Sequence, residues 1–203
     1  MFILAHLGIT LATVKVGTVI SDKLRAVTVA GESRKSKANL DDHEAGKLSP
    51  TSPVDYRFLL LGAILPDLID KPLGMVLLGE QIGNGHIFTH TLLFALVLLH
   101  GGVILSGQGR RMLLSLFVGV FFHLVLDKMW FEPHVLLWPL YGWAFPKETP
   151  MSILEFVKSV LQGWISTPAV VGSEAIGGML LLAAMLGLIS RRRLRRFAKV
   201  GDL

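Results

Sequence analysis

The chain contains no cysteine, and charged residues occupy only 17% of its 203 positions. The absence of cysteine excludes disulfides, thiolate metal sites and cysteine nucleophiles, so a functional site has to use histidine, carboxylates or hydroxyls. Soluble domains carry about 25% charged residues. This shortage of charge, with a hydrophobic content of 52% and a mean hydropathy of +0.58, argues against a disordered chain and against a water-soluble single domain.

Long apolar runs indicate an all-α integral membrane protein that consists of a single transmembrane domain with a bundle of about five helices. A membrane-crossing helix needs about 20 mostly apolar residues. The second run is interrupted by Pro66, Asp67 and Asp70, and a broken helix at that depth must be covered by protein or water. The five candidate spans are residues 2–20, 57–78, 88–105, 112–128 and 172–190.

The net charge of +5 resides entirely in residues 191–203, a basic tail that directly follows the last apolar run. Such a tail is typical of a cytoplasmic helix end rather than of a nucleic-acid-binding patch, and it is compatible with anionic lipid head groups. With the tail inside, fifteen Lys and Arg residues fall on the cytoplasmic side and four on the outer side. We therefore expect a multi-pass protein with its N-terminus outside and its C-terminus in the cytoplasm.

Two longer polar segments separate the apolar runs. Residues 21–56 balance six basic against six acidic residues and predict a solvated cytoplasmic loop, in which His43 is given no role. Residues 129–171 hold all four tryptophans, which favour the head-group layer, and predict an outer interfacial segment. Within it, residues 151–165 have the 3.6-residue apolar period of an amphipathic helix that lies on the membrane or packs on the bundle.

Ionisable side chains inside the apolar runs are functional candidates, because a charge in a membrane is costly. His86 and His90 are four residues apart, as are His123 and Asp127, and on a helix such a pair projects from one face and can hold a metal ion. At 1.5 Å per helical residue, seven side chains lie within roughly 15 Å of the outer boundary of the membrane. They are His6, Asp67, Asp70, His86, His90, His123 and Asp127.

Three further polar residues are placed by the same depth argument. His100 lies about 15 Å deeper than His90 and is assigned a structural role. His134 lies at the right level to support a ligand, to be an extra ligand or to contact substrate, but it fits an interfacial surface histidine equally well. Glu132, two residues earlier, is placed with it as a group that supports the ligands.

Four motifs within residues 1–140 carry a resemblance: His6, Gly-Ala-Ile-Leu-Pro-Asp-Leu-Ile-Asp at 62–70, His-Ile-Phe-Thr-His-Thr at 86–91 and His-Leu-Val-Leu-Asp at 123–127. The sequence resembles the YdjM-like family of bacterial and archaeal inner-membrane proteins, regarded as metal-dependent hydrolases and distantly similar to the zinc-dependent phospholipase C and nuclease superfamily. The resemblance implies the cytoplasmic (inner) membrane of a prokaryote. It also implies the metal ligands His6, Asp67, His86, His90, His123 and Asp127.

We therefore expect a membrane-embedded metal-dependent hydrolase that acts on a phosphoester of a lipid or lipid-linked substrate at the outer leaflet, with no nucleic-acid partner. Ligands without thiolate suit one or two Zn²⁺ ions, with Mn²⁺ or Fe²⁺ as alternatives. Asp70, with Asp67, is the candidate catalytic carboxylate, as a general base or bridging ligand. Two other functions stay open, a metal-ion or proton transporter and a non-catalytic membrane scaffold.

Overall fold

The computed structural model describes residues 3–36, 53–147, 152–190 and 192–203, and these residues form helices and no strand. The all-α class expected from the sequence is thereby confirmed. The α-helices are α1 (Ile3–Ser36), α2 (Tyr56–Lys71), α3 (Leu92–Ile104), α4 (Gly107–Leu126), α5 (Pro133–Leu136), α6 (Ile153–Ser166), α7 (Pro168–Ser190) and α8 (Leu194–Val200). A π-helix, η1 (Pro72–Leu77), continues α2, and a 3₁₀ turn, η2 (Met129–Phe131), follows α4.

Three of the described helices are long and apolar enough to cross a membrane, namely residues Ile3–Ala26 of α1, α4 and α7. Helix α3 is apolar but has 13 residues, about 20 Å of helix. Helix α2 contains Pro66 and two aspartates. The structure therefore supports a membrane protein with three candidate spans, and the five-span bundle is not established.

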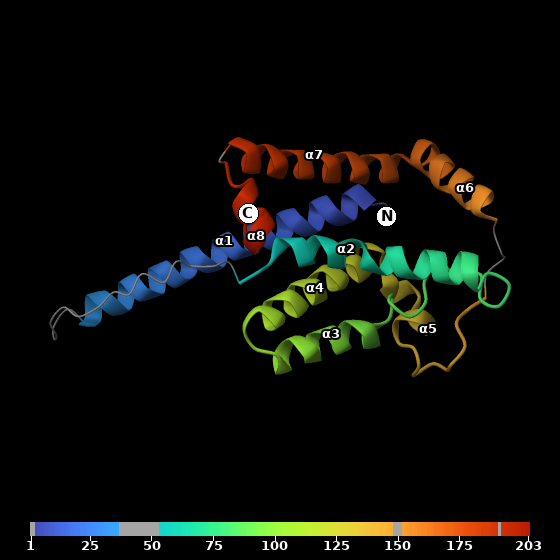
Figure 1. The fold of residues 1–203 in the computed structure, drawn as a ribbon, viewed down its shortest axis with the longest axis horizontal. Helices are drawn as coiled ribbons and strands as arrows, with labels where there is room; N and C mark the ends of the chain where they lie inside the picture. Colours follow the sequence, from blue (N-terminus) through green and yellow to red (C-terminus); the bar gives the residue numbers. More distant parts are fainter. Residues whose placement is uncertain (1–2, 37–52, 148–151, 191) are drawn as a thin grey trace.

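The long helices pack side by side in the order α7, α1, α2, α4 and α3 (Figure 1). The crossing of α2 and α4 is close because glycines face each other there. A Cβ on Gly62 would overlap the carbonyl of Leu116, and a Cβ on Gly119 would overlap the carbonyl of Leu59. This close approach brings the polar residues of α2 next to the C-terminal turn of α4.

Several helix boundaries differ from the predicted spans, and α4, for example, begins at Gly107 rather than at 112. Helix α1 continues to Ser36, so the expected loop over residues 21–56 is helical in its first part, and this end of α1 extends beyond the other helices (Figure 1). Residues 37–52, including His43, lie outside the described residues. Helix α3 begins at Leu92 rather than 88, because the Thr91 side chain caps it by accepting a hydrogen bond from the Phe94 amide (3.1 Å).

A helix forms where the amphipathic segment was expected. Helix α6 begins after a capping box in which Ser152 and Glu155 satisfy each other's backbone amides. Leu154, Val157 and Leu161 leave 64%, 45% and 55% of their surface exposed, so an apolar stripe of α6 is left uncovered by the chain. This exposure fits an interfacial helix, although its place at a membrane surface stays a prediction.

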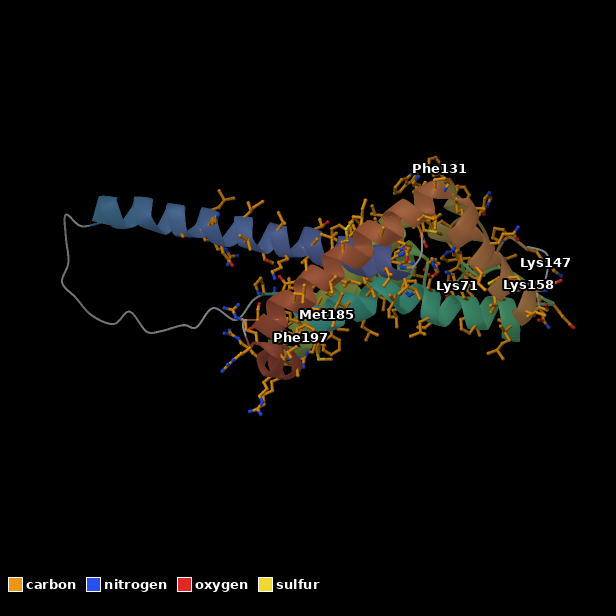
Figure 2. All side chains as sticks on the ribbon, turned by 90° about the horizontal axis from the view of Figure 1, so that it is seen from above. Lys71, Phe131, Lys147, Lys158, Met185 and Phe197 are labelled. Carbon is orange, nitrogen blue, oxygen red and sulfur yellow. The ribbon has the colours of Figure 1, made fainter. Side chains whose placement is uncertain are left out.

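The basic tail is not an extended segment. It folds back as α8, and Phe197 packs with Leu203 against a buried cluster of Leu11, Tyr56 and Leu59. Phe197 lies at the opposite end of the bundle from Phe131, which follows α4 (Figure 2). The basic tail and the turn after α4 therefore lie at opposite ends of the bundle.

Candidate metal centre

The aspartates of α2 follow directly on a proline within the helix. Pro66 has no N–H to donate to the carbonyl of Gly62, which weakens the helix locally. The carbonyl of Pro66 itself accepts a hydrogen bond from the Thr89 hydroxyl (3.2 Å). Asp67 and Asp70 are three residues apart, so this part of α2 presents both carboxylates toward the segment that contains Thr89.

Asp70 organises the segment before α3. Its carboxylate is fully buried and accepts hydrogen bonds from the amides of Ile87 (3.0 Å), Thr89 (2.9 Å) and His90 (3.1 Å). Because these amides point to one carboxylate, residues 86–91 form a non-helical loop. The expectation that His86 and His90 share one face of a helix is therefore wrong.

His90 and His123 are each fixed through their Nδ1 atom. His90 Nδ1 lies 2.8 Å from Asp70 Oδ2, and His123 Nδ1 lies 2.8 Å from the carbonyl of Ala63. A carbonyl only accepts, so His123 Nδ1 carries a proton, and an ionised carboxylate likewise requires a protonated Nδ1 on His90. In both neutral rings the lone pair is then on Nε2.

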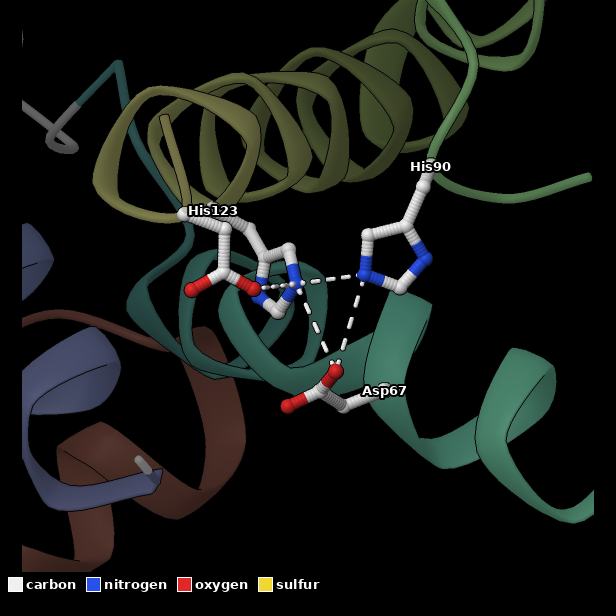
Figure 3. A group of neighbouring side chains, drawn as sticks. Asp67, His90 and His123 are labelled. Carbon is white, nitrogen blue, oxygen red and sulfur yellow. Dashed lines mark hydrogen bonds and ion pairs between the residues drawn. The ribbon is translucent and has the colours of Figure 1, made fainter. Parts of the chain in front are cut away.

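Four side chains bring their ligand atoms within 4.8 Å of one another: Asp67, His90, His123 and Asp127. Figure 3 shows Asp67 below the two imidazoles, His90 and His123, with its carboxylate directed between them. His90 Nε2 lies 3.1 Å from His123 Nε2, and Asp67 Oδ1 lies 3.5 Å and 3.8 Å from these two nitrogens. Asp127 completes the group from the end of α4, 3.4 Å from His123 Nε2 and four residues along the chain, as its spacing predicts.

This arrangement fits a metal ion on chemical grounds. Two Nε2 lone pairs that face each other at 3.1 Å repel unless one ring gains a second proton or a cation lies between them. Two histidine nitrogens on a tetrahedral Zn²⁺ lie about 3.3 Å apart, which follows from Zn–N bonds of about 2.0–2.1 Å. Asp67 Oδ1 is buried and accepts no hydrogen bond within the described part of the chain, so it is available as a third ligand.

His6 reaches the same cluster from α1. Its side chain is 1% exposed, its Nε2 lies 3.1 Å from Asp127 Oδ1, and its ring stacks on His123 with centroids 4.3 Å apart. His6 is not one of the four residues whose ligand atoms all lie within 4.8 Å of one another. It contacts both His123 and Asp127, and it can join the group through the Asp127 carboxylate.

The remaining residues predicted for the site lie around it. Asp70 is behind His90, and its contacts with N–H donors favour an orienting role over the general-base or bridging role expected from the sequence. His86 is at the rim, 3.2 Å from Glu132 through Nδ1, and its ring centroid is 4.5 Å from that of His90. His134 is exposed and contacts Tyr141 edge to face, away from the four central groups.

Two residues near the site were not singled out from the sequence. Lys71 Nζ forms an ion pair with Asp67 Oδ2 at 2.7 Å, and the i,i+4 spacing on α2 was the available signal. Glu174 of α7 is 6% exposed and accepts hydrogen bonds from the amides of Leu4 (3.1 Å) and Ala5 (2.9 Å), so it caps the start of α1 next to His6. An acidic residue within the last apolar helix was its signal.

An aromatic wall stands beside the His86–His90 loop. Phe88 contacts Trp138 and Phe145 edge to face, with centroids 5.6 Å and 5.0 Å away, and Trp138 stacks on Phe145. Trp143 contacts Trp138 and is 80% exposed. The loop that carries His86 and His90 is thus bordered by exposed aromatic surface.

The fold and the cluster together define a helical membrane protein with a His/Asp group that could hold a metal ion. The chain belongs to the YdjM inner membrane protein family, whose model matches residues 2–196, so the family resemblance of its motifs is confirmed. Comparisons with curated proteins and with solved structures returned no match.

Proposed function

We propose that this chain is a membrane-embedded metal-dependent hydrolase that acts on a phosphoester of a lipid or lipid-linked substrate. The observation that carries this proposal is that three atoms able to bind a metal lie close together: the Nε2 atoms of His90 and His123, and Asp67 Oδ1. Histidines that merely join helices would donate and accept in pairs. Here, each ring donates a hydrogen bond from Nδ1 to a group outside the cluster, so the lone pair on Nε2 faces the cluster.

His90, His123, Asp67 and Asp127 would hold the ion, and His6 with Asp127 would extend the site toward a second one. The N and O donor set suits Zn²⁺ first, with Mn²⁺ or Fe²⁺ as alternatives. When bound, such an ion polarises a phosphoryl oxygen and lowers the pKa of its water to about 7. Asp67 is then a ligand, and Asp70 fixes the tautomer and the ring orientation of His90.

The chain's own groups at the rim would handle the proton and the charge of the substrate. His86 and Glu132 are 27% and 44% exposed, and their pairing places an imidazole between solvent and the cluster, as proton transfer to a leaving group requires. The ammonium of Lys71, 30% exposed, lies where it can meet a phosphate oxygen beside Asp67. None of these three rim residues, His86, Glu132 and Lys71, is among the four groups that would hold the ion.

The outer leaflet of a prokaryotic inner membrane is the proposed place of reaction. The basic tail favours a cytoplasmic C-terminus and, with five membrane-crossing segments, an outer N-terminus. The cluster then lies at the outer end of α4, because His123 and Asp127 belong to its last turn and C-cap. Exposed Trp143 and the wall of Phe88 and Trp138 suit a lipid head group better than a soluble nucleotide.

The direct test is the elemental content of the purified protein. We expect about one or two transition-metal ions per chain, and their loss in His123→Ala and in Asp127→Ala. His100→Ala is the matched control, because this exposed histidine of α3 lies outside the cluster. Full metal occupancy in the two site variants, or a folded wild type without metal, would overturn the assignment of the site.

The type of function is tested separately from the metal. Phospholipids and prenyl phosphates would be assayed for metal-dependent phosphate or head-group release in detergent micelles, with a chelated sample as the blank. A hydrolase predicts release that is lost in His123→Ala and kept in His100→Ala. Metal flux into proteoliposomes that Asp67→Asn abolishes, without any hydrolysis, would instead identify a transporter.

A further inference from the structure

A cationic surface covers the turn after α7 and the outward side of α8. Its members are exposed and, within the described parts of the chain, no carboxylate lies within 4.0 Å of any of them. They are Arg192, Arg193, Arg195 and Lys199. We call this set the α8 basic surface.

The backbone of α8 is fixed by bundle residues rather than by its own cations. Arg57 Nη1 donates to the carbonyl of Ala198 (2.6 Å), and Arg111 Nη1 donates to the carbonyl of Val200 (2.9 Å). The amide of Tyr56 donates to the carbonyl of Gly201 (2.9 Å). Arginines thus bind the carbonyls at the C-terminal end of α8, where cations are favoured, and the α8 basic surface is left facing outward.

The two described carboxylates that pair with arginines at this end of the bundle are Asp55 and Asp202. Asp55 is paired with Arg57 (2.7 Å), and Asp202 is paired with Arg111 (2.6 Å) and Arg196 (3.2 Å). Both carboxylates are buried. Within the described parts of the chain, the cations of the α8 basic surface are therefore left without a carboxylate partner.

The position of α8 at the end of the candidate span of α7 indicates which type of anion can reach the α8 basic surface. The candidate span of α7 ends at Ser190, and Arg192 takes a left-handed backbone conformation (φ 53°) that reverses the chain, with the Arg193 amide bonded to the Leu188 carbonyl (2.9 Å). Phe197 is at the same time packed into the bundle. The α8 basic surface is thereby held at the end of a membrane span, which is the level of lipid head groups.

We propose that the α8 basic surface is a binding site for the head groups of anionic phospholipids. Charge complementarity and the position at the end of α7 carry this proposal, and it does not depend on the metal site. Anionic phosphates supply the missing counter-charge and relieve the repulsion among the clustered cations. Nucleic acid has the same charge but would have to approach a surface that adjoins the bilayer.

The test is a titration of the detergent-solubilised full chain with phosphatidylglycerol or phosphatidylcholine, read as the thermal unfolding midpoint. We expect phosphatidylglycerol to raise the midpoint, phosphatidylcholine to leave it unchanged, and added salt to reduce the rise. The variant Arg195→Gln/Lys199→Gln should need about tenfold or more phosphatidylglycerol for the same rise. Lys23→Gln/Arg25→Gln is the matched control, since it removes two exposed cations from α1, and it should titrate like the wild type.

Two outcomes would overturn the proposal. Equal responses to the two lipids, or a double variant that titrates like the wild type, would show that the α8 basic surface binds no head group. A short DNA duplex that raises the midpoint and displaces phosphatidylglycerol would identify a nucleic-acid surface instead.

Discussion

At the scale of single residues, the direction of the ring protons distinguishes this cluster from ordinary buried histidines. His123 Nδ1 donates a hydrogen bond to the carbonyl of Ala63, and His90 Nδ1 donates one to the carboxylate of Asp70. Groups outside the cluster therefore decide where the inward lone pairs point. Such outer partners commonly change metal affinity about 10–100-fold when removed.

Replacing Asp70 by asparagine tests this orienting role. The side-chain amide of the variant would keep one acceptor oxygen and would direct N–H donors toward a loop that already supplies four N–H groups. We expect Asp70→Asn to weaken Zn²⁺ binding about 10–100-fold, measured by competition with a chromophoric chelator. His123→Ala should abolish binding, and Asp22→Asn, an exposed acid on α1, should change nothing. Unchanged affinity in Asp70→Asn would show that Asp70 does not orient His90.

At the scale of elements, spacing in the sequence predicts geometry only where the predicted helix forms. His123 and Asp127 meet as an i,i+4 pair because the last turn of α4 is helical up to its C-cap. His86 and His90 have the same spacing, but the Asp70 carboxylate attracts the amides of residues 87, 89 and 90 and keeps them out of a helix. The residues in these contacts are 17 to 20 positions apart in the sequence, so local periodicity does not show them and the loop could not be predicted.

The crossing of α1 and α7 depends on a pair of glycines in the same way as that of α2 and α4. A Cβ on Gly8 would overlap the carbonyl of Gly177, and a Cβ on Gly177 would overlap the carbonyl of Leu4. Both are backbone atoms, which cannot rotate away as a side chain can. Because Gly8 is two residues after His6, this crossing also sets the position of His6 at the site.

Gly8→Ala and Gly17→Ala form a matched pair on one helix. A Cβ on Gly17 meets nothing within 4 Å, so Gly17→Ala should gain about 0.5–1 kcal/mol of helix propensity. Gly8→Ala should instead destabilise the protein by about 1–3 kcal/mol, because the two backbones must separate. The free energy of unfolding in denaturant-containing micelles measures both. Equal effects of the two substitutions would mean that α1 and α7 do not pack as closely as described.

At the scale of the whole molecule, the two ends of the bundle carry different charged groups. Near η2, histidines and aspartates of α1, α2, α4 and the loop before α3 converge, and Lys71 pairs with Asp67. Near α8, Arg57 of α2, which is paired with buried Asp55, donates to the Ala198 carbonyl. Arg111 of α4 donates to the Val200 carbonyl and pairs with Asp202. The composition of the tail predicted its charge. Its docking could not be predicted from charge, because it depends on backbone carbonyls at the end of α8 that accept hydrogen bonds from Arg57 and Arg111.

The docked tail makes stability depend on pH through Asp55. Burial opposes the charged carboxylate, but hydrogen bonds from Arg57 and the charges of Arg57 and Arg111 outweigh it and hold the pKa of Asp55 below its ordinary 3.8. A pKa that is lower in the folded state stabilises the protein above the unfolded value, and this stabilisation is lost as the pH falls through the folded value. Between about pH 5 and pH 3, the thermal unfolding midpoint of the wild type should therefore fall more than that of Asp55→Asn, whose residue 55 does not titrate.

Both proteins would be measured with chelator present, so that protonation of metal ligands does not contribute through lost metal. Parallel midpoint curves for the two proteins would show that Asp55 does not couple protonation to the docking of the tail, and Asp22→Asn, whose carboxylate lies on exposed α1, should follow the wild type throughout.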